Sequence, residues 1–414
     1  MSLSSKRPVH REVVPLALAC VLALGGWSTH QAYAQQVISM SVDIGGPGRD
    51  GGPSMVAKRF VAKAAKVTGM SAEQAEQAGA IHEGYVSAFE IRRKAFRDAL
   101  EEARRSSDDT GDFSAFTEKL PALDKSFRED AAKLEGDFLS DLRALLSSSQ
   151  EAAWARVERM RRREVGLASG SMSGESMDVI AIVDELDLSS ADRTAVTPIL
   201  EQYELELDRL MVARLQGRGE RPGWTPGKPI DIQEMQASMA KAKEEGIKVR
   251  DVHRDAARKV EALLPEGVQA DFRERVRAAS HPRVYRKGRT ARELDAAAAM
   301  TDLDDSQRSR LADIRASYER EVAPLNAGWA KAIEESEASG QTGGAGGGVV
   351  LSFGNESEGL REARRARREL DEQVSKRVRG VLNQSQQERL PKAGKGEGEE
   401  GQIEGNAVII RRSE

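Results

Sequence analysis

Residues 146–150 read LSSSQ, and this short pattern recurs along the chain. An apolar residue stands first, a Ser, Asp or Asn that can cap a helix stands second, and Gln or Asp closes the segment. A cap oxygen and a Gln three residues later form a capping box, which satisfies N–H groups left unpaired in the first helical turn. Related segments are MSAEQ at 70–74, LSSAD at 188–192, LDDSQ at 303–307, LNQSQ at 382–386 and a degenerate LPE starting at 264.

Each copy predicts the start of a helix, and the spacing of the copies predicts three tandem modules. The copies that start at 70 and 146, at 188 and 264, and at 303 and 382 form three pairs with nearly equal separations. The residues expected to form the caps are Ser71, Gln74, Ser147, Gln150, Ser189, Asp192, Asp304, Gln307, Asn383 and Gln386.

Apolar residues repeat at fixed distances from these motifs. In every module an Ile follows the first motif at the same distance from its start, and a Tyr stands one helical turn beyond that Ile. A step of four keeps both side chains on one helix face, which predicts a core stripe. The alternative for the tyrosines is an aromatic row that faces a client protein. The predicted repeat core, with two aromatic residues that follow the second motifs, is Ile81, Tyr85, Ile199, Tyr203, Ile314, Tyr318, Trp154 and Phe272.

These stripes predict an all-α protein of tandem antiparallel helical hairpins, because neither long helix of a module can bury its apolar face alone. Strand-like pieces at 38–42, 349–353 and 407–410 predict minor β structure at most. The expected division is a signal peptide at 1–34, a Gly-rich linker with a short helix at 35–69, module 1 at 70–187, module 2 at 188–302, module 3 at 303–391 and a flexible tail at 392–414.

The segment at 1–34 is typical of a secretory signal peptide. A basic stretch with Lys6, Arg7 and Arg11 precedes an apolar run at 13–24, and AYA at 32–34 fits a small-residue cleavage site. The apolar run is too short to span a bilayer. An alternative makes Cys20, the one cysteine of the chain, the lipidated residue of a lipoprotein, although the apolar run continues beyond it. We expect export and a periplasmic location.

The composition argues against several classes of function. Lys and Arg total 63 against 67 Asp and Glu, and this net charge of −4 argues against a nucleic-acid partner. One Cys and five His provide no Cys-based zinc cluster and no shared ligand spacing. Because no Ser/His/Asp set, phosphate loop or HExxH motif occurs, we expect no enzyme activity, no metal and no cofactor.

Two Leu-Ser/Thr-x-x-Gln motifs around a helical hairpin, behind a signal peptide, resemble the Spy/CpxP (LTXXQ-motif) family of periplasmic proteins. The match is best at residues 146–150 followed by Trp154, and it covers most of residues 70–391 in three copies. The resemblance implies an all-helical protein of a family whose members form cradle-shaped dimers and hold client proteins on a concave face without ATP, or modulate envelope stress. This chain has Ser, Asp or Asn at the cap in place of Thr, three modules in place of one, and no His-rich end.

Two arginine clusters are the candidate contact residues for clients or anions. Their positive charge would attract acidic clients or anionic headgroups, and the alternative is a solvated helix face with Glu partners nearby. A membrane surface is therefore compatible with the sequence but not required by it. The first cluster is Arg161, Arg162 and Arg163. The second is Arg361, Arg364, Arg365, Arg367 and Arg368, of which Arg364, Arg365 and Arg368 are the candidate contacts.

Two functions fit these features. In the first, the protein holds unfolded or partly folded exported proteins, or binds an envelope sensor protein, through apolar patches among basic residues. In the second, the modules are a structural or adaptor element of the cell envelope without chaperone activity. Excess apolar area on one face favours the first, and uniformly polar outer faces favour the second. The oligomeric state stays open.

Overall fold

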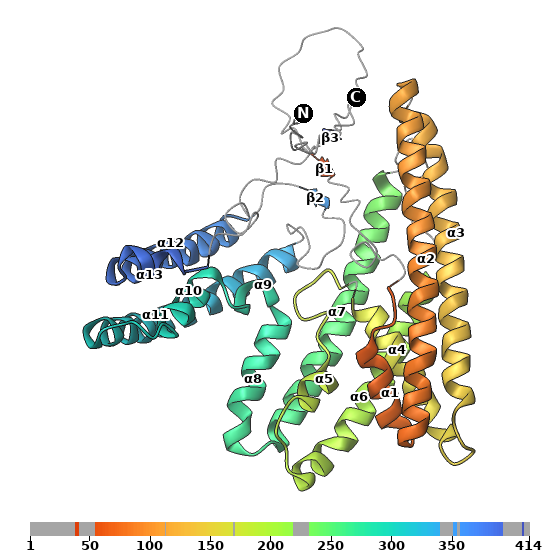
Figure 1. The fold of residues 1–414 in the computed structure, drawn as a ribbon, viewed down its shortest axis with the longest axis horizontal. Coiled ribbons are helices and arrows are strands. Elements are labelled where there is room, and N and C mark those ends of the chain that lie inside the picture. The colour runs from red at the N-terminus through yellow and green to blue at the C-terminus, as the bar shows by residue number, and fades with distance from the viewer. Residues whose placement is uncertain are drawn as a thin grey trace, which may run out of the picture. The chain divides into compact units, whose positions relative to one another are not determined.

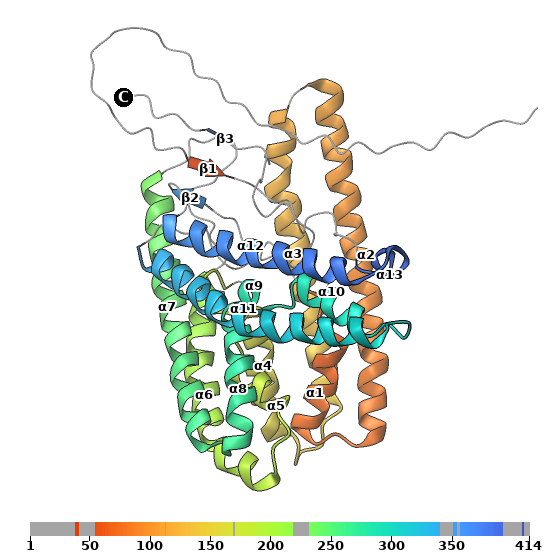
Figure 2. The ribbon, with the colours of Figure 1, turned by 90° about the vertical axis from the view of Figure 1, so that its left-hand side faces the viewer.

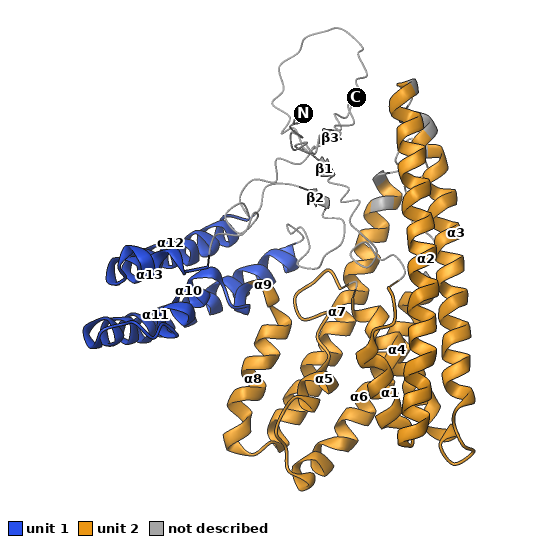
Figure 3. Ribbon diagram, viewed as in Figure 1, with its two compact units in different colours: residues 1–43, 284–344, 349–414 blue, residues 44–283, 345–348 orange. Residues whose placement is uncertain are grey.

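The computed structural model describes residues 38–40, 54–111, 113–168, 170–217, 232–339, 351–353, 357–391 and 408–409. The chain divides into two compact units (Figure 3). Unit 1 contains residues 1–43, 284–344 and 349–414, and unit 2 contains residues 44–283 and 345–348. The expected signal peptide, Cys20 included, and most of the linker and tail lie outside the described residues.

Helices dominate both units, which confirms the all-α class (Figure 1). Those of unit 2 are α1 (Lys58–Thr68), α2 (Ala72–Thr110), α3 (Phe113–Ala144), α4 (Trp154–Leu167), α5 (Val179–Asp184), α6 (Ser190–Gly217), α7 (Ile232–Leu263) and α8 (Glu266–Ser280), with one 3₁₀ turn at Glu151–Ala153. The helix that crosses into unit 1 is α9 (Pro282–Tyr285). Unit 1 also has α10 (Arg289–Ala298), α11 (Asp305–Ser339), α12 (Glu358–Val381) and α13 (Gln384–Glu388).

Three short strands form a small antiparallel sheet within unit 1. They are β1 (Ile38–Met40), β2 (Leu351–Phe353) and β3 (Val408–Ile409), in the order β2-β1-β3. Ser39 of the central strand lies opposite Ser352 on one side and Ile409 on the other. The strands coincide with the strand-like pieces of the sequence, and the β structure of the described residues is minor.

The first hairpin consists of α2 and α3, which lie side by side in both views (Figures 1 and 2). Its core is aromatic: the rings of Tyr85 and Phe138 stack with centroids 4.6 Å apart, and those of Phe96 and Phe127 stack at 4.7 Å. Phe96 follows Tyr85 along α2, whereas its partner Phe127 precedes Phe138 along α3, so the two helices are antiparallel. Burial of each large apolar side chain stabilises such a hairpin by about 1.5–3 kcal/mol.

The second hairpin consists of α6 and α7, and it belongs to the same unit. Tyr203, Leu207 and Met211 lie on successive turns of α6 and are at most 2% exposed. They share one core with Val260 of α7 and Phe272 of α8. The four-residue steps along α6 are the helical spacing on which the sequence prediction of this stripe rested.

Helix α4 joins the first and second hairpins within unit 2. Trp154 at its start belongs to the core of the first hairpin, and Leu167 at its end belongs to the core of the second. Gly166 permits the close approach of α4 to α6, because a Cβ at this position would lie 2.2 Å from Met211 Sδ. A side chain larger than hydrogen would therefore require the buried Met211 side chain to move or the two helices to separate.

The third hairpin consists of α11 and α12 and forms the body of unit 1 (Figure 2). Helix α10 packs against both of its helices. The core side chains come from all three helices and include Leu294, Ala297, Leu311, Ile314, Tyr318, Leu370, Val374 and Val378.

A short helix precedes each hairpin and packs onto it. Apolar residues of α1, α5 and α10 belong to the cores of the first, second and third hairpins, respectively. The sequence division assigned residues 179–184 to module 1 and residues 289–298 to module 2, whereas these helices pack with the hairpin that follows them. The packed repeat is therefore a short helix, two long antiparallel helices and a further short helix.

Candidate functional site

The two motifs of module 1 bind each other at the base of the first hairpin. Ser71 Oγ accepts the Gln74 N–H at 3.2 Å, and Gln74 Oε1 accepts the Ser71 N–H at 2.8 Å, which completes the expected capping box. The amides of Gln74 and Gln150 also pair, each Nε2 donating to the other Oε1, at 3.0 and 3.1 Å. Their Nε2 groups reach further, to Leu145 O at 2.6 Å and Gly69 O at 2.7 Å. This glutamine pair joins two segments 76 residues apart.

The third hairpin repeats this arrangement. Asp304 and Asn383 form capping boxes with Gln307 and Gln386. Gln307 Nε2 donates to Gln386 Oε1 at 2.9 Å and to Val381 O at 2.9 Å, and Gln386 Nε2 donates to Asp302 O at 3.1 Å. The Gln386 side chain is buried, so these bonds replace contacts with water.

The second hairpin has no glutamine pair. The Asp192 N–H donates to Ser189 Oγ at 3.1 Å, so the first helix is capped, but a carboxylate offers no donor to a second motif. Pro265 stands at the other cap without a side-chain hydrogen bond. Gln269 Nε2 donates only to Leu264 O, at 3.0 Å, within its own turn.

Ser147 departs from its predicted role. Its N–H donates to Gln150 Oε1 at 2.9 Å, but its hydroxyl bonds to the side chains of Gln150 and Ser149 and caps no backbone N–H. The chain turns through 147–150, makes one 3₁₀ turn and begins α4 only at Trp154. Successive Ser hydroxyls bond locally and compete with a helix start, which accounts for the shift.

The tyrosines of the repeat lie in the hairpin cores. The hydroxyl of Tyr85 accepts the Val56 N–H at 3.2 Å, and that of Tyr203 accepts the Val179 N–H at 3.3 Å. Both N–H groups stand at the start of a short preceding helix, so each tyrosine anchors that helix to its hairpin. All three tyrosines, Tyr318 included, are at most 5% exposed. The companion residues Ile81 and Ile199 are half-buried, and Ile314, Trp154 and Phe272 are buried.

In the third hairpin the tyrosine hydroxyl has different partners. Tyr318 donates to Asp371 Oδ1 at 2.9 Å and accepts from Arg367 Nη2 at 2.9 Å. Burial raises the pKa of Tyr318 to about 12. Arg367 lies between the arginines expected to contact clients, yet it is buried and also donates to Asn326 Oδ1 at 2.9 Å.

A buried polar network fills the middle of the second hairpin. His253 Nε2 donates to the backbone carbonyl of Glu175 at 3.1 Å, so its Nδ1 is free to accept the Tyr203 hydroxyl at 2.8 Å. Burial lowers the pKa of His253 to about 4, and the side chain is neutral at pH 7. The Glu175 carboxylate accepts the N–H groups of Ser171 and Met172 and pairs with Arg214. These bonds hold residues 171–178 against the second hairpin.

The arginines Arg161, Arg162 and Arg163 do not face a client. Arg161 pairs with Glu135 Oε2 at 2.7 Å and with Glu164 Oε2 at 2.9 Å. Arg162 pairs with Asp208 at 2.7 Å, and Arg163 with Asp178 at 2.9 Å and Glu204 at 3.3 Å. Arg161 and Arg163 are buried. The charges of this cluster therefore join α4 to α3 and α6, and the buried Arg161 and Arg163 are not exposed for contact with clients or anions.

The second predicted cluster lies on the outer part of α12. Arg365 and Arg368 are exposed and Arg364 is half-buried. Arg365 lies 3.8 Å from Glu369, an exposed pair of the kind that contributes little to stability. This helix face carries both positive and negative side chains. That is the alternative given above for the cluster, a solvated face on which Glu residues lie near the arginines.

Four other arginines line a groove between α7 and α8. The groove has a volume of about 300 Å³. Arg254 and Arg258 come from α7, and Arg273 and Arg277 come from α8. We call this feature the basic groove. Its other lining residues are Met177, Ala257, Glu261, Phe272, Val276 and Ser280.

A sequence signal for the basic groove exists in two arginine pairs at a spacing of four. Arg254 and Arg258, and likewise Arg273 and Arg277, lie on one face of their helices. The sequence analysis missed them because exposed arginines are common on helices, and only the packing of α7 against α8 makes the two pairs converge.

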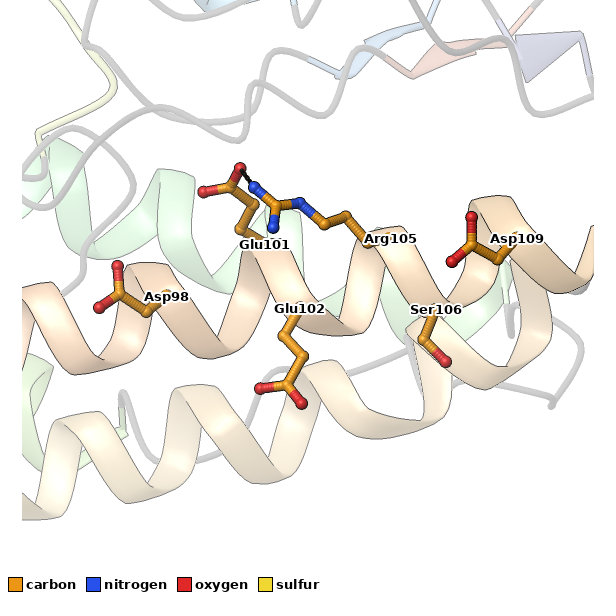
Figure 4. Close-up of a pocket in the computed structure, with 6 residues that line it drawn as sticks. All are labelled: Asp98, Glu101, Glu102, Arg105, Ser106 and Asp109. Atoms are coloured by element: carbon orange, nitrogen blue, oxygen red, sulfur yellow. Dashed lines mark hydrogen bonds and ion pairs between the residues drawn. The ribbon is translucent and has the colours of Figure 1, made fainter.

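Other surface features of the described residues are less specific. A wider hollow of about 750 Å³ follows one face of α2, where Glu101 pairs with Arg105 (Figure 4). All of its lining residues belong to that one helix, so it has no opposing wall. The exposed large apolar side chains are scattered over several elements and comprise Met55, Ile91, Leu205 and Leu263.

Within the described ranges, no helix is long and apolar enough to cross a membrane, and no group of three or more His, Cys, Asp or Glu is placed to hold a metal ion. Comparison of the chain with models of protein families gave no match. Comparisons with curated proteins and with solved structures gave no match either.

Proposed function

We infer that this chain is an exported, non-enzymatic binding protein of the periplasm, which holds unfolded or partly folded segments of other exported proteins without ATP. The observation that carries the proposal is the repetition of one packed hairpin, each copy with its own short helix and core. Repeated helical units present an extended outer surface, and several weak contacts along it raise the total affinity for a flexible chain.

The distribution of charge supports a binding role for the helix surfaces. Buried charged groups are committed to internal partners: Glu175 to Arg214, Arg163 to Asp178 and Glu204. The groups left for contact with another molecule are the exposed side chains of the long helices. Exposed charges act mainly on the rate and specificity of encounter, which suits a protein that meets many partners.

An adaptor or spacer without chaperone activity is the second candidate. It is favoured by the scatter of exposed large apolar side chains: Ile91 lies on α2, Leu205 on α6 and Leu263 on α7. The i,i+4 ion pairs that cover the outer faces, such as Lys133 with Asp137, are also typical of a helix that stays solvated.

Light scattering separates the two candidates. A chemically denatured protein is diluted into buffer with and without the mature chain, in the absence of ATP. A holding protein suppresses aggregation at near-stoichiometric ratios. An adaptor leaves the scattering unchanged for several clients and salt concentrations, and that result would refute the holding function.

A further inference from the structure

The basic groove combines an apolar floor with a positively charged rim. Phe272 and Met177 are each 1% exposed and Ala257 is 5% exposed, so the floor consists of side chains from the core of the second hairpin. The volume of about 300 Å³ is at the lower end of the range for ligand pockets. An apolar side chain that binds in the groove would bury part of its surface against this floor, which favours binding.

The rim has more positive than negative charge. Arg277 is exposed and forms no ion pair with any residue that the structure describes. Arg258 Nη2 donates to Asp255 Oδ1 at 3.4 Å, and Lys259 binds the other oxygen of that carboxylate at 2.6 Å, so Arg258 takes part in an exposed and weak ion pair. Glu261 is the one acidic residue among the lining side chains, and it pairs with Arg273 at 3.5 Å. The α8 side of the rim thus has the guanidinium of Arg277, unpaired within the described part of the chain, and the α7 side has Arg258, whose exposed pair with Asp255 can exchange for another carboxylate.

The basic groove is specific to one copy of the repeat. Alignment of the modules on their second motifs, which start at 146, 264 and 382, shows what the other copies have at the four arginine positions. In module 1 these positions hold Gly136, Ser140, Ala155 and Arg159. Arg159 is already bound to Glu204 at 3.1 Å. In module 3 the first three of these positions hold Glu372, Lys376 and Pro391.

We propose that the basic groove binds peptide segments in which carboxylate side chains flank an apolar side chain. The proposal rests on the protein-holding function and names the segments that module 2 selects. A guanidinium binds a carboxylate through two parallel hydrogen bonds, and the opposed rims place such groups on both sides of one apolar residue. A groove lined by two helices fits a peptide side chain better than the flat surface of an anionic bilayer.

Fluorescence anisotropy of a dye-labelled synthetic peptide tests the proposal. Glutamates flank leucines in the probe, and Gln replaces every Glu in the control peptide. The mature full chain is compared with R258Q/R277Q, which removes one exposed charge from each rim. The matched control R97Q/R209Q removes two exposed charges elsewhere in unit 2. We expect R258Q/R277Q to weaken the Glu peptide about tenfold and R97Q/R209Q to change its Kd less than about twofold.

Each outcome has a defined meaning. Equal affinity for the Glu and Gln peptides, or an unchanged Kd in R258Q/R277Q, would overturn the proposal. Binding to vesicles with anionic lipid that is lost in R258Q/R277Q, with no binding of the peptide, would overturn it in favour of a membrane. If the chain suppresses aggregation but peptide binding does not depend on the groove arginines, the holding function is supported and the proposal for the basic groove is refuted. If the groove binds the peptide but the chain does not suppress aggregation, the proposal for the groove is supported and the holding function is refuted.

Discussion

Replacement of Gln150 by Ala tests the glutamine pair at the base of the first hairpin. The change removes five hydrogen bonds: two within the amide pair with Gln74, one to Gly69 O, one from the Ser147 N–H and one from the exposed Ser147 hydroxyl, which keeps Ser149 as a partner. These groups are partly open to solvent, so each bond is taken at the lower limit of about 0.5 kcal/mol. For the four bonds other than that of the Ser147 hydroxyl, the local free energy of unfolding should therefore fall by about 2 kcal/mol.

Hydrogen–deuterium exchange measured by mass spectrometry is the suitable assay, because the chain has two units and a single global transition is not expected. A loss of about 2 kcal/mol corresponds to about thirtyfold faster exchange of the amides at the ends of α2 and α3. Peptides from α11 and α12 serve as an internal reference. Their protection should not change.

The second hairpin provides the matched control. Gln269 makes one hydrogen bond, to Leu264 O, so its replacement by Ala should accelerate local exchange only about twofold. The double variant Q74A/Q150A should cost less than the sum of the single changes, because both lose the same amide pair. Equal effects of Q150A and Q269A, or strict additivity of Q74A and Q150A, would refute the reasoning.

Three further predictions concern unit 2. His253 has a pKa of about 4 when folded and 6.5 when unperturbed, so the unfolded state binds the proton more strongly. The stability that comes from burying neutral His253 is present above pH 6.5 and is lost as pH falls. The free energy of unfolding, measured by hydrogen exchange in α7, should therefore drop by about 2 kcal/mol between pH 7.5 and 5. The variant H253Q should not show this pH-dependent drop. Gly166→Ala should lower the free energy of unfolding in urea by about 1–3 kcal/mol, because the new methyl group overlaps Met211. The same change in a Met211→Ala background should cost less. An unchanged free energy of unfolding in Gly166→Ala would contradict the close approach of α4 to α6. Arg163→Ala should cost about 1.5–3 kcal/mol because it removes the bonds of a buried guanidinium to Asp178 and Glu204, although Glu204 keeps Arg159. The exposed Arg365→Ala of unit 1 should cost less than about 0.5 kcal/mol, and similar losses in thermal melts would contradict the assignment.

The sequence predicts the helices well because their signals are local. Cap residues such as Ser71 and the four-residue apolar steps that include Tyr203 act within one or two turns, and both are visible without knowledge of the fold. The short helices α5 and α10 were assigned to the preceding module. Their apolar faces do not show whether each helix packs on the hairpin before it or on the hairpin after it. Their partners are set by tertiary packing.

The roles of the arginines depend on contacts that are distant in sequence. Arg163 and Glu204 are 41 residues apart, and no local pattern indicates that α4 packs on α6. The run of residues 161–163 therefore has the same appearance as an exposed basic patch. Conversely, Arg258 and Arg277 look like ordinary surface residues until α8 folds back onto α7. The glutamine pair is a similar case, since each Gln completes a local motif and also bonds across the hairpin.

The glutamine pairs have a consequence for how the chain responds to its surroundings. A primary amide does not titrate in the physiological range, and its bonds are uncharged, so acid and dissolved salt leave the bases of the first and third hairpins joined. The junction between α4 and α6 is different, because it depends on ion pairs such as Arg159 with Glu204 and Arg162 with Asp208, which dissolved salt weakens. A rise in ionic strength should therefore weaken the connection between the first hairpin and the second more than it weakens the bases of the hairpins.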